Sequence, residues 1–167
     1  MKALRPKDIT HVEITVSNLE RSLHFYRDLL GLQESPIPEG VDPADALKGD
    51  DLDGTNEYPN RKLRFAVLRY ATTPNVAPFS PGYEPCAVVL IAPFDPPPSG
   101  KPIKVDQIGI SHVSFLMEGP FESVEARMRA ADVKIVGRQA AKDPKHPSKS
   151  IFVEDPDGIL IQLDILP

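Results

Sequence analysis

Apolar and polar residues alternate in two stretches near opposite ends of the chain. In residues 9–16, Val12, Ile14 and Val16 alternate with polar residues, and in residues 108–117, Val113, Phe115 and Met117 have the same spacing of two. Alternation with a period of two is typical of a strand that has one buried face. Each stretch therefore predicts a strand, and each carries a histidine near its start, His11 in the first and His112 in the second.

Each of these strands is followed by a segment with helical spacing of its apolar residues. In the first segment, Ser17 and Glu20 have the spacing of a capping box, and Gly31 is placed to end the helix. His24 lies off the apolar stripe, so we expect it to face solvent. A second helix is predicted from Pro120 to Ala131, with the proline at its first position.

Further strands are predicted after each helix, at residues 32–37, 62–71, 85–94 and 133–136, and as a hairpin over 150–166. The order of elements thus repeats once. It predicts an α+β fold in which two paired βαβββ modules form a curved mixed sheet, an incomplete barrel, around a central cavity. A single domain is expected over residues 1–167. Its parts are a first module at about 8–94, a proline-rich linker at 95–107 and a second module at about 108–167.

Composition excludes several classes of protein. The formal net charge is −5 and the basic residues are scattered, which argues against a nucleic-acid-binding protein. One cysteine, Cys86, excludes a disulfide framework and a cysteine-based zinc cluster. The sequence has neither an apolar run long enough to span a membrane nor the apolar core of a signal peptide. We therefore expect a cytoplasmic protein that does not enter membranes.

Polar side chains gather on one face of the predicted strands. If the apolar residues of each strand pack against the helices, the opposite faces carry His11, Glu13, His112, Ser114, Gln162 and Asp164. Buried polar groups need partners in each other, in water or in a ligand. The pattern alone leaves open whether the two histidines bind a ligand or are satisfied locally at strand ends.

Other candidates are less constrained by the pattern. Arg64 and Tyr70 share one face of the strand at 62–71 and would suit an anionic or phenolic substrate, whereas Arg69 lies on the other face. The sequence does not decide which face is inward. His146 belongs to a polar loop that is expected near the mouth of the cavity.

Three segments carry a resemblance to a known family. HVEITVSNLERSLHFYRDLLGL (11–32) resembles the opening module of the vicinal oxygen chelate superfamily, and FVEDPDGILIQL (152–163) resembles its closing hairpin. ISHVSFLM (110–117) resembles the start of its second module. This superfamily includes glyoxalases, fosfomycin- and bleomycin-resistance proteins, epimerases and extradiol dioxygenases. The resemblance weakens through residues 33–84.

The resemblance implies one divalent metal ion, of Fe, Mn, Ni or Zn, with His11, His112 and Gln162 as ligands. The remaining ligand position of the family falls near Leu90, which cannot bind metal, and Gln162 stands where a glutamate is usual. Glu13 is on the same strand face as His11. It would either restore a carboxylate ligand or act as a general base.

The implied function is a metal-dependent enzyme of lyase, isomerase or epimerase type, acting on a small oxygenated molecule that chelates the metal. An extradiol ring-cleaving dioxygenase and a metal-free small-molecule binding or resistance protein are the alternatives. The candidate substrate-binding residues are Arg64, Tyr70, Ser114, His146 and Asp164. By analogy with the family, a homodimer is expected.

Overall fold

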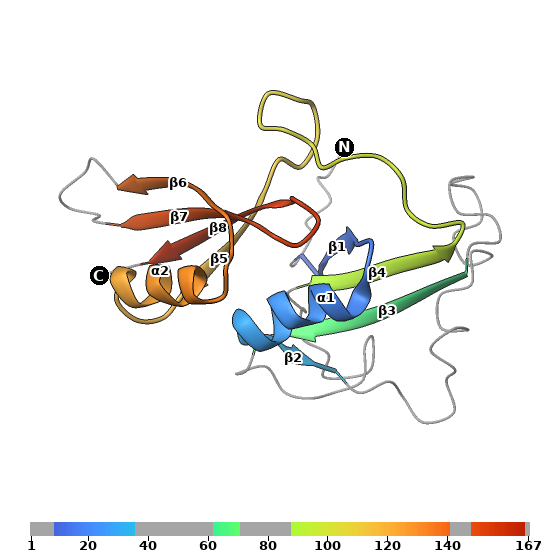
Figure 1. Cartoon of the computed structure of the whole chain (residues 1–167), viewed down its shortest axis with the longest axis horizontal. Coiled ribbons are helices and arrows are strands. Elements are labelled where there is room, and N and C mark those ends of the chain that lie inside the picture. Colours follow the sequence, from blue (N-terminus) through green and yellow to red (C-terminus); the bar gives the residue numbers. More distant parts are fainter. Residues whose placement is uncertain (1–8, 36–61, 71–87, 141–147, 166–167) are drawn as a thin grey trace, which may run out of the picture. The chain divides into compact units, whose positions relative to one another are not determined.

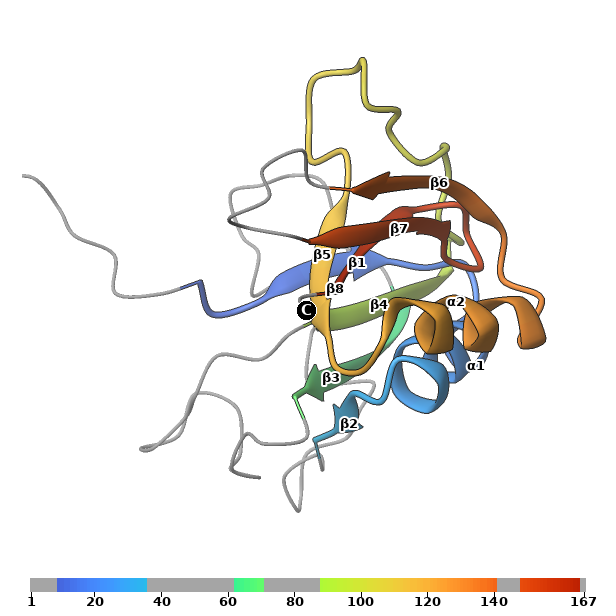
Figure 2. The same cartoon turned by 90° about the vertical axis from the view of Figure 1, so that its left-hand side faces the viewer.

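The computed structural model of the chain describes residues 9–35, 62–70, 88–140 and 148–165. The chain divides into two compact units, Met1–Ser99 and Gly100–Pro167, which are called module one and module two below. The boundary between them falls inside the predicted proline-rich linker. Figure 1 and Figure 2 show the elements of each module in two views.

Module one has the element order strand, helix, three strands, as predicted. Its elements are β1 (Val12–Thr15), α1 (Leu19–Leu23), η1 (His24–Leu29), β2 (Gln33–Glu34), β3 (Lys62–Arg69) and β4 (Val88–Asp95). The sheet has the order β1-β4-β3-β2. Strands β1 and β4 are parallel, whereas the other pairs are antiparallel.

Module two repeats this arrangement. Its elements are β5 (Val113–Met117), α2 (Phe121–Ala130), β6 (Ile135–Ala140), β7 (Lys149–Glu154) and β8 (Leu160–Ile165). The sheet order is β5-β8-β7-β6, with β5 parallel to β8 and antiparallel pairs elsewhere. The predicted α+β fold with two βαβββ modules is therefore confirmed, and the strands belong to two four-stranded mixed sheets.

Each module has its own apolar core between the helical segment and one face of the sheet (Figure 1). In module one, Ile14, Leu68 and Leu90 are buried on that face, and Phe25 and Tyr26 of the helical segment are also buried. In module two, the core is formed by Val124 and Met128 of α2 with Ile151, Ile161 and Leu163 of the sheet. The alternation in the sequence therefore gives the burial correctly in both modules.

The first helix begins one residue later than the predicted capping box. Asn18, and not Ser17, is the N-cap, and its Oδ1 accepts a hydrogen bond from the backbone N–H of Arg21 at 3.0 Å. Ser17 Oγ instead accepts a hydrogen bond from the Arg21 guanidinium. The capping-box prediction was therefore wrong, because an asparagine caps as well as a serine and lies one position closer to the apolar stripe.

The helix continues as a single π-helical segment, η1, before it ends at Gly31. Gly31 has a φ of +84°, and its N–H donates to the Arg27 carbonyl, so the predicted terminating glycine is confirmed. The second helix differs at its start. Pro120 is its N-cap and not its first helical residue, and no side chain caps this end.

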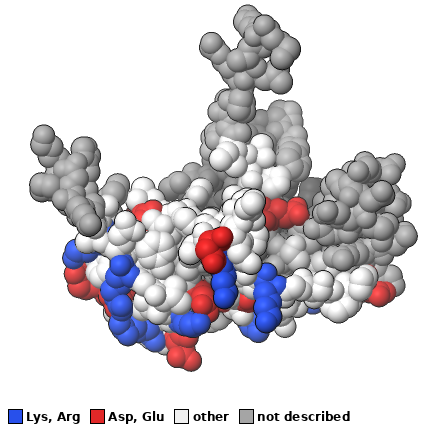
Figure 3. Space-filling view, turned by 90° about the horizontal axis from the view of Figure 1, so that it is seen from above, with Lys and Arg blue, Asp and Glu red and all other residues white. Residues whose placement is uncertain are grey.

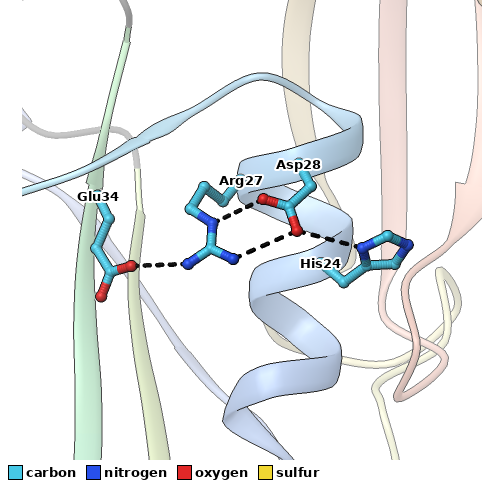
Figure 4. A network of polar contacts seen from close by, with 4 residues as sticks. All are labelled: His24, Arg27, Asp28 and Glu34. Carbon is cyan, nitrogen blue, oxygen red and sulfur yellow. Dashed lines mark hydrogen bonds and ion pairs between the residues drawn. The ribbon is translucent and has the colours of Figure 1, made fainter.

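His24 faces solvent, as predicted, and belongs to a surface network that links η1 to β2 (Figure 4). Its Nδ1 lies 3.2 Å from Asp28 Oδ2, and Arg27 bonds both Asp28 and Glu34. The hydrogen bond from Arg27 is the main cause that lowers the pKa of Asp28. These exposed groups stabilise the end of the helix and show no connection to the strand histidines.

A tight turn at Asp155–Gly158 joins β7 to β8. The buried Asp155 carboxylate accepts hydrogen bonds from the N–H groups of Asp157 and Ile159, at 2.9 and 2.8 Å. Gly158 has a φ of +88°, a conformation that favours glycine. The turn therefore sets which residues of β8 lie opposite which residues of β7.

Acidic and basic side chains are interspersed on the face drawn in Figure 3. In module two, Glu125 of α2 pairs with both Arg129 and Arg138, and Lys134 pairs with Glu154 at 2.8 Å. The two arginines lower the pKa of Glu125 to about 2. Among the described residues, no helix is long and apolar enough to cross a membrane.

Candidate functional site

The face of each sheet opposite its helix is called the open face here, and it carries Glu13 in module one and Ser114, Gln162 and Asp164 in module two. Paired residues on neighbouring strands project to the same face. In module two, Ser114 pairs with Gln162, Leu116 pairs with Asp164, and Ser150 pairs with Asp164. These polar residues therefore share the open face, as the sequence predicted for Ser114, Gln162 and Asp164.

Asp164 is the centre of a hydrogen-bond network on this face. Its Oδ1 accepts from Ser150 Oγ at 2.6 Å and from Gln162 Nε2 at 2.7 Å. Its Oδ2 accepts from Ser114 Oγ. Sequence reasoning had placed Ser114 and Asp164 on this face but had missed their contact, because the two residues are far apart in the chain and only the register of β5 and β8 brings them together.

These hydrogen bonds keep Asp164 ionised. Partial burial of the carboxyl group opposes ionisation, but the hydrogen bonds from Ser114, Ser150 and Gln162, together with the charge of His112 when protonated, outweigh it and lower the pKa of Asp164. The network thus holds one fixed negative charge beside Gln162.

His112 lies just before β5, and its two ring nitrogens have different surroundings. Nδ1 lies 3.0 Å from Ser111 Oγ, and the ring meets Phe152 edge-on with centroids 6.4 Å apart. Among the described residues, Nε2 has no hydrogen-bond partner. When Nδ1 carries the proton, it donates a hydrogen bond to Ser111 Oγ, and the lone pair of Nε2 is available to a metal ion.

His11 has the same arrangement in module one. Its Nδ1 lies 3.2 Å from Thr10 Oγ1, and the described residues provide no partner for Nε2. Glu13 follows on the open face of β1 and is exposed to solvent. Both modules therefore place a histidine directly after a hydroxyl residue at the start of the first strand.

The register corrects the fourth ligand position. Leu90 pairs with Ile14 and is completely buried, so it lies on the helix-facing side of the sheet. Val89 pairs with Glu13, just as Gln162 pairs with Ser114 in module two. The position equivalent to Gln162 in module one is therefore Val89. Like leucine, valine has no atom that can bind a metal ion.

The register also separates the arginines of β3. Arg64 pairs with Ala92 and lies on the face of Ile14 and Leu90, away from Glu13. Arg69 lies on the other face with Gln33; it is buried, and its Nε donates to Ser35 Oγ. Arg64 is therefore not on the open face of module one, and its role in substrate binding stays a prediction.

Two further candidates are not tested by these contacts. Tyr70 follows the last residue of β3 and is 47% exposed. His146 lies outside the described residues. Both stay predictions.

The types of donor atom fit a divalent first-row transition-metal ion. The described residues contain no cluster of three or more His, Cys, Asp or Glu side chains that could hold a metal. The donors expected from the resemblance are instead one imidazole in module one, and one imidazole and one amide oxygen in module two. Imidazole nitrogen suits Zn, Fe and Ni, and carbonyl oxygen suits Mn.

Two mixed-sheet βαβββ modules, each with a histidine at the start of its first strand, define a small class of α+β proteins. A family model described as the Glyoxalase/Bleomycin resistance protein/Dioxygenase superfamily matches residues 8–163. The chain belongs to this superfamily. No curated protein matches the sequence significantly.

Solved structures show the same fold. A glyoxalase family protein from Bacillus cereus superposes with a TM-score of 0.69 at 17% identity, covering 99% of this chain and 98% of that one. A glyoxylase/bleomycin resistance protein/dioxygenase domain from Frankia sp. EAN1pec gives 0.59 at 16% identity, with 98% and 94% coverage. The fosfomycin resistance protein FosX from Listeria monocytogenes gives 0.53 at 12% identity, with 98% and 96% coverage.

Proposed function

We propose that the protein is a metal-dependent enzyme of lyase, isomerase or epimerase type that acts on a small oxygenated molecule. His11, His112 and Gln162 would hold one divalent ion, and two oxygen atoms of the substrate would complete its coordination. Membership of the superfamily supports a metal site of this class, and its details would depend on the chain's own residues. The protein would act in the cytoplasm, as a homodimer like many relatives.

The observation that carries this proposal is the repeated surroundings of the two histidines. In each module the Nδ1 atom is next to the hydroxyl group of the preceding residue, at 3.2 Å for His11 and 3.0 Å for His112. Such outer contacts help to orient metal-binding imidazoles. If the two histidines were only polar residues at strand ends, the same contact would not be expected in both modules.

The residues around the donors support proton transfer on a bound substrate. A bound divalent ion would polarise a substrate carbonyl and lower the cost of negative charge on its oxygen. Glu13 is exposed on the same strand as His11, so its carboxylate is free to take a proton from substrate and return it. Ser114 and Asp164 bond each other, so their role is to support Gln162 and not to contact substrate.

A metal-free binding protein is the second candidate, and Val89 favours it. Module one has an apolar side chain where module two has Gln162, and none of the three proposed donors, His11, His112 and Gln162, is a carboxylate. Fewer charged ligands weaken metal binding. An extradiol dioxygenase has less support, because Glu13 would have to become a ligand.

Metal analysis of the full chain separates these candidates. The protein is purified without a tag, incubated separately with Mn²⁺, Fe²⁺, Ni²⁺ and Zn²⁺, and freed of excess ion before elemental analysis. A stoichiometric amount of one ion is expected. Trace amounts with all four would contradict the enzyme proposal and favour the metal-free candidate. If metal binds, oxygen uptake in the presence of catechols would indicate the dioxygenase instead.

A further inference from the structure

A carboxylate lies beside Gln162, the only amide among the proposed ligands. Gln162 and Asp164 are two residues apart on β8, so both project to the open face of module two. Gln162 Nε2 donates to Asp164 Oδ1 at 2.7 Å. The carboxylate is itself held by Ser150 from β7 and Ser114 from β5. Three strands therefore fix the position of Asp164.

The chemistry of these groups decides which way the Gln162 amide faces. An ionised carboxylate only accepts hydrogen bonds, so the amide must turn its NH₂ group, and not its oxygen, toward Asp164. The amide is planar, and its carbonyl oxygen therefore points away from Asp164. No second partner of that oxygen is present among the described residues. It is the atom of Gln162 that is available to a ligand.

We propose that Asp164 is a positioning residue that presents the Gln162 carbonyl oxygen to the metal ion and supplies, from the outer shell, the negative charge that a glutamate at position 162 would carry itself. This inference rests on the proposed function, because it treats Gln162 as a metal ligand. Asp164 makes no contact with substrate in this role, in contrast to the role expected from the sequence.

The two residues then form a matched pair. A glutamate at position 162 would place a second carboxylate oxygen at hydrogen-bond distance from Asp164, with no proton between them, and like charges repel at that distance. Gln162→Glu alone is therefore unfavourable, although glutamate is the better ligand. Adding Asp164→Asn restores one donor and one acceptor, with the charge moved from position 164 to position 162.

A double-mutant cycle tests this pairing with Zn²⁺ as the probe. Wild type, Gln162→Glu, Asp164→Asn and the double variant are titrated by calorimetry as full-length chains. Outer-shell partners change metal affinity by about 10- to 100-fold. We expect Asp164→Asn to weaken Zn²⁺ binding by about tenfold in the wild-type background and to strengthen it by about tenfold in the Gln162→Glu background. An effect of the same sign in both backgrounds would overturn the inference.

The melting temperatures of the metal-free proteins test the pair independently of any metal. Gln162→Glu should lower the Tm, and Asp164→Asn should raise it again in that background. If the Tm changes of the two single variants simply add in the double variant, the pairing is overturned, whatever the Zn²⁺ titrations give. If the shifts are coupled but no variant binds Zn²⁺, the contact holds and both the proposed function and the role toward metal fail. Glu118→Gln, which removes an exposed charge after β5, is the matched control and should change neither measure.

Discussion

The two modules have the same backbone pairing but different chemistry on their open faces. By register, Glu13, Val89, Ile91 and Phe65 in module one occupy the positions of Ser114, Gln162, Asp164 and Ser150 in module two. Module two therefore carries a hydrogen-bonded polar network where module one carries Glu13 and three apolar side chains. The shared features are the buried faces and the histidine that follows a hydroxyl residue.

This difference teaches that the repeated fold does not require repeated chemistry. The buried faces must stay apolar in both modules, because each core depends on them. The open faces are free of that requirement, so one module can concentrate polar groups while the other supplies mainly a histidine and a carboxylate. The five predictions below test this division, from the largest expected effect to the smallest.

His11 and His112 should contribute equally to Zn²⁺ affinity, although the side chains on the open faces of the two modules differ. His11→Ala and His112→Ala each remove a proposed ligand, so each should reduce Zn²⁺ affinity by more than the roughly 10- to 100-fold that loss of an outer partner costs. Calorimetric titration measures the loss. His24→Ala removes an exposed histidine elsewhere and is the control. If His11→Ala or His112→Ala binds Zn²⁺ with wild-type affinity, the replaced histidine is not a ligand.

The buried faces should be equally sensitive to cavities. Leu90 and Leu163 have matching positions in the two registers, and both are completely buried. Leu90→Ala and Leu163→Ala should each lower the free energy of unfolding by about 2–5 kcal/mol, measured by urea denaturation. Val89→Ala, on the half-buried open face, should cost less than Leu90→Ala. A larger loss of stability for Val89→Ala than for Leu90→Ala would mean that Val89, and not Leu90, faces the core.

Val89→Glu places a carboxylate at the module-one position that matches Gln162. Introducing a charge at a half-buried position should destabilise the metal-free protein by about 1–3 kcal/mol. Zn²⁺ should then stabilise this variant more than it stabilises wild type. The added carboxylate would strengthen Zn²⁺ binding in the folded state only, and tighter binding to the folded state raises stability. Thermal unfolding with and without Zn²⁺ measures both effects, and Val89→Gln controls for charge. An equal Zn²⁺ shift in wild type and variant would argue against the equivalence.

The helix starts should respond differently in the two modules. Asn18 caps α1 through its side chain, whereas α2 begins at Pro120 without a side-chain cap. Asn18→Ala should therefore cost about 1 kcal/mol of stability, as expected for the loss of an N-cap. Ser17→Ala removes only an exposed contact with Arg21 and should cost less. A larger loss for Ser17→Ala would restore serine as the cap.

The smallest effect should be a pH-dependent one in module two. Arg138 and Arg129 lower the pKa of Glu125 from its ordinary 4.5 to about 2. Because the folded-state pKa is lowered, the ion pairs stabilise the fold fully above pH 4.5, and this contribution disappears as the pH falls toward 2. The Tm difference between wild type and Glu125→Gln should shrink over that range. The groups are exposed, so the difference is small even at neutral pH.

Much of the fold could be predicted because it depends on local pattern. The alternation at both ends, Gly31 and the DPDG turn each determine a local structure, and all of them are found as predicted. Errors of one residue arose where two neighbouring residues satisfy the same local rule. Ser17 and Asn18 both suit an N-cap, and Leu90 and Val89 both suit a buried strand.

The site was harder to predict because it depends on register between distant strands. A shift of one residue moves every side chain of a strand to the other face. Sequence spacing therefore could not distinguish Arg64 from Arg69, or Leu90 from Val89. It also could not reveal that Ser150 supports Asp164, since that contact exists only when β7 and β8 pair as they do.

The turn at Asp155–Gly158 has a consequence for how this chain can evolve. Because the Asp155 carboxylate and Gly158 hold the register of the hairpin, an insertion there would carry Ile161 and Leu163 out of the core. Substitutions at 160, 162 and 164 leave the core untouched. The chemistry of the open face can thus change by single-residue replacement, whereas changes in the length of this turn should be eliminated by selection.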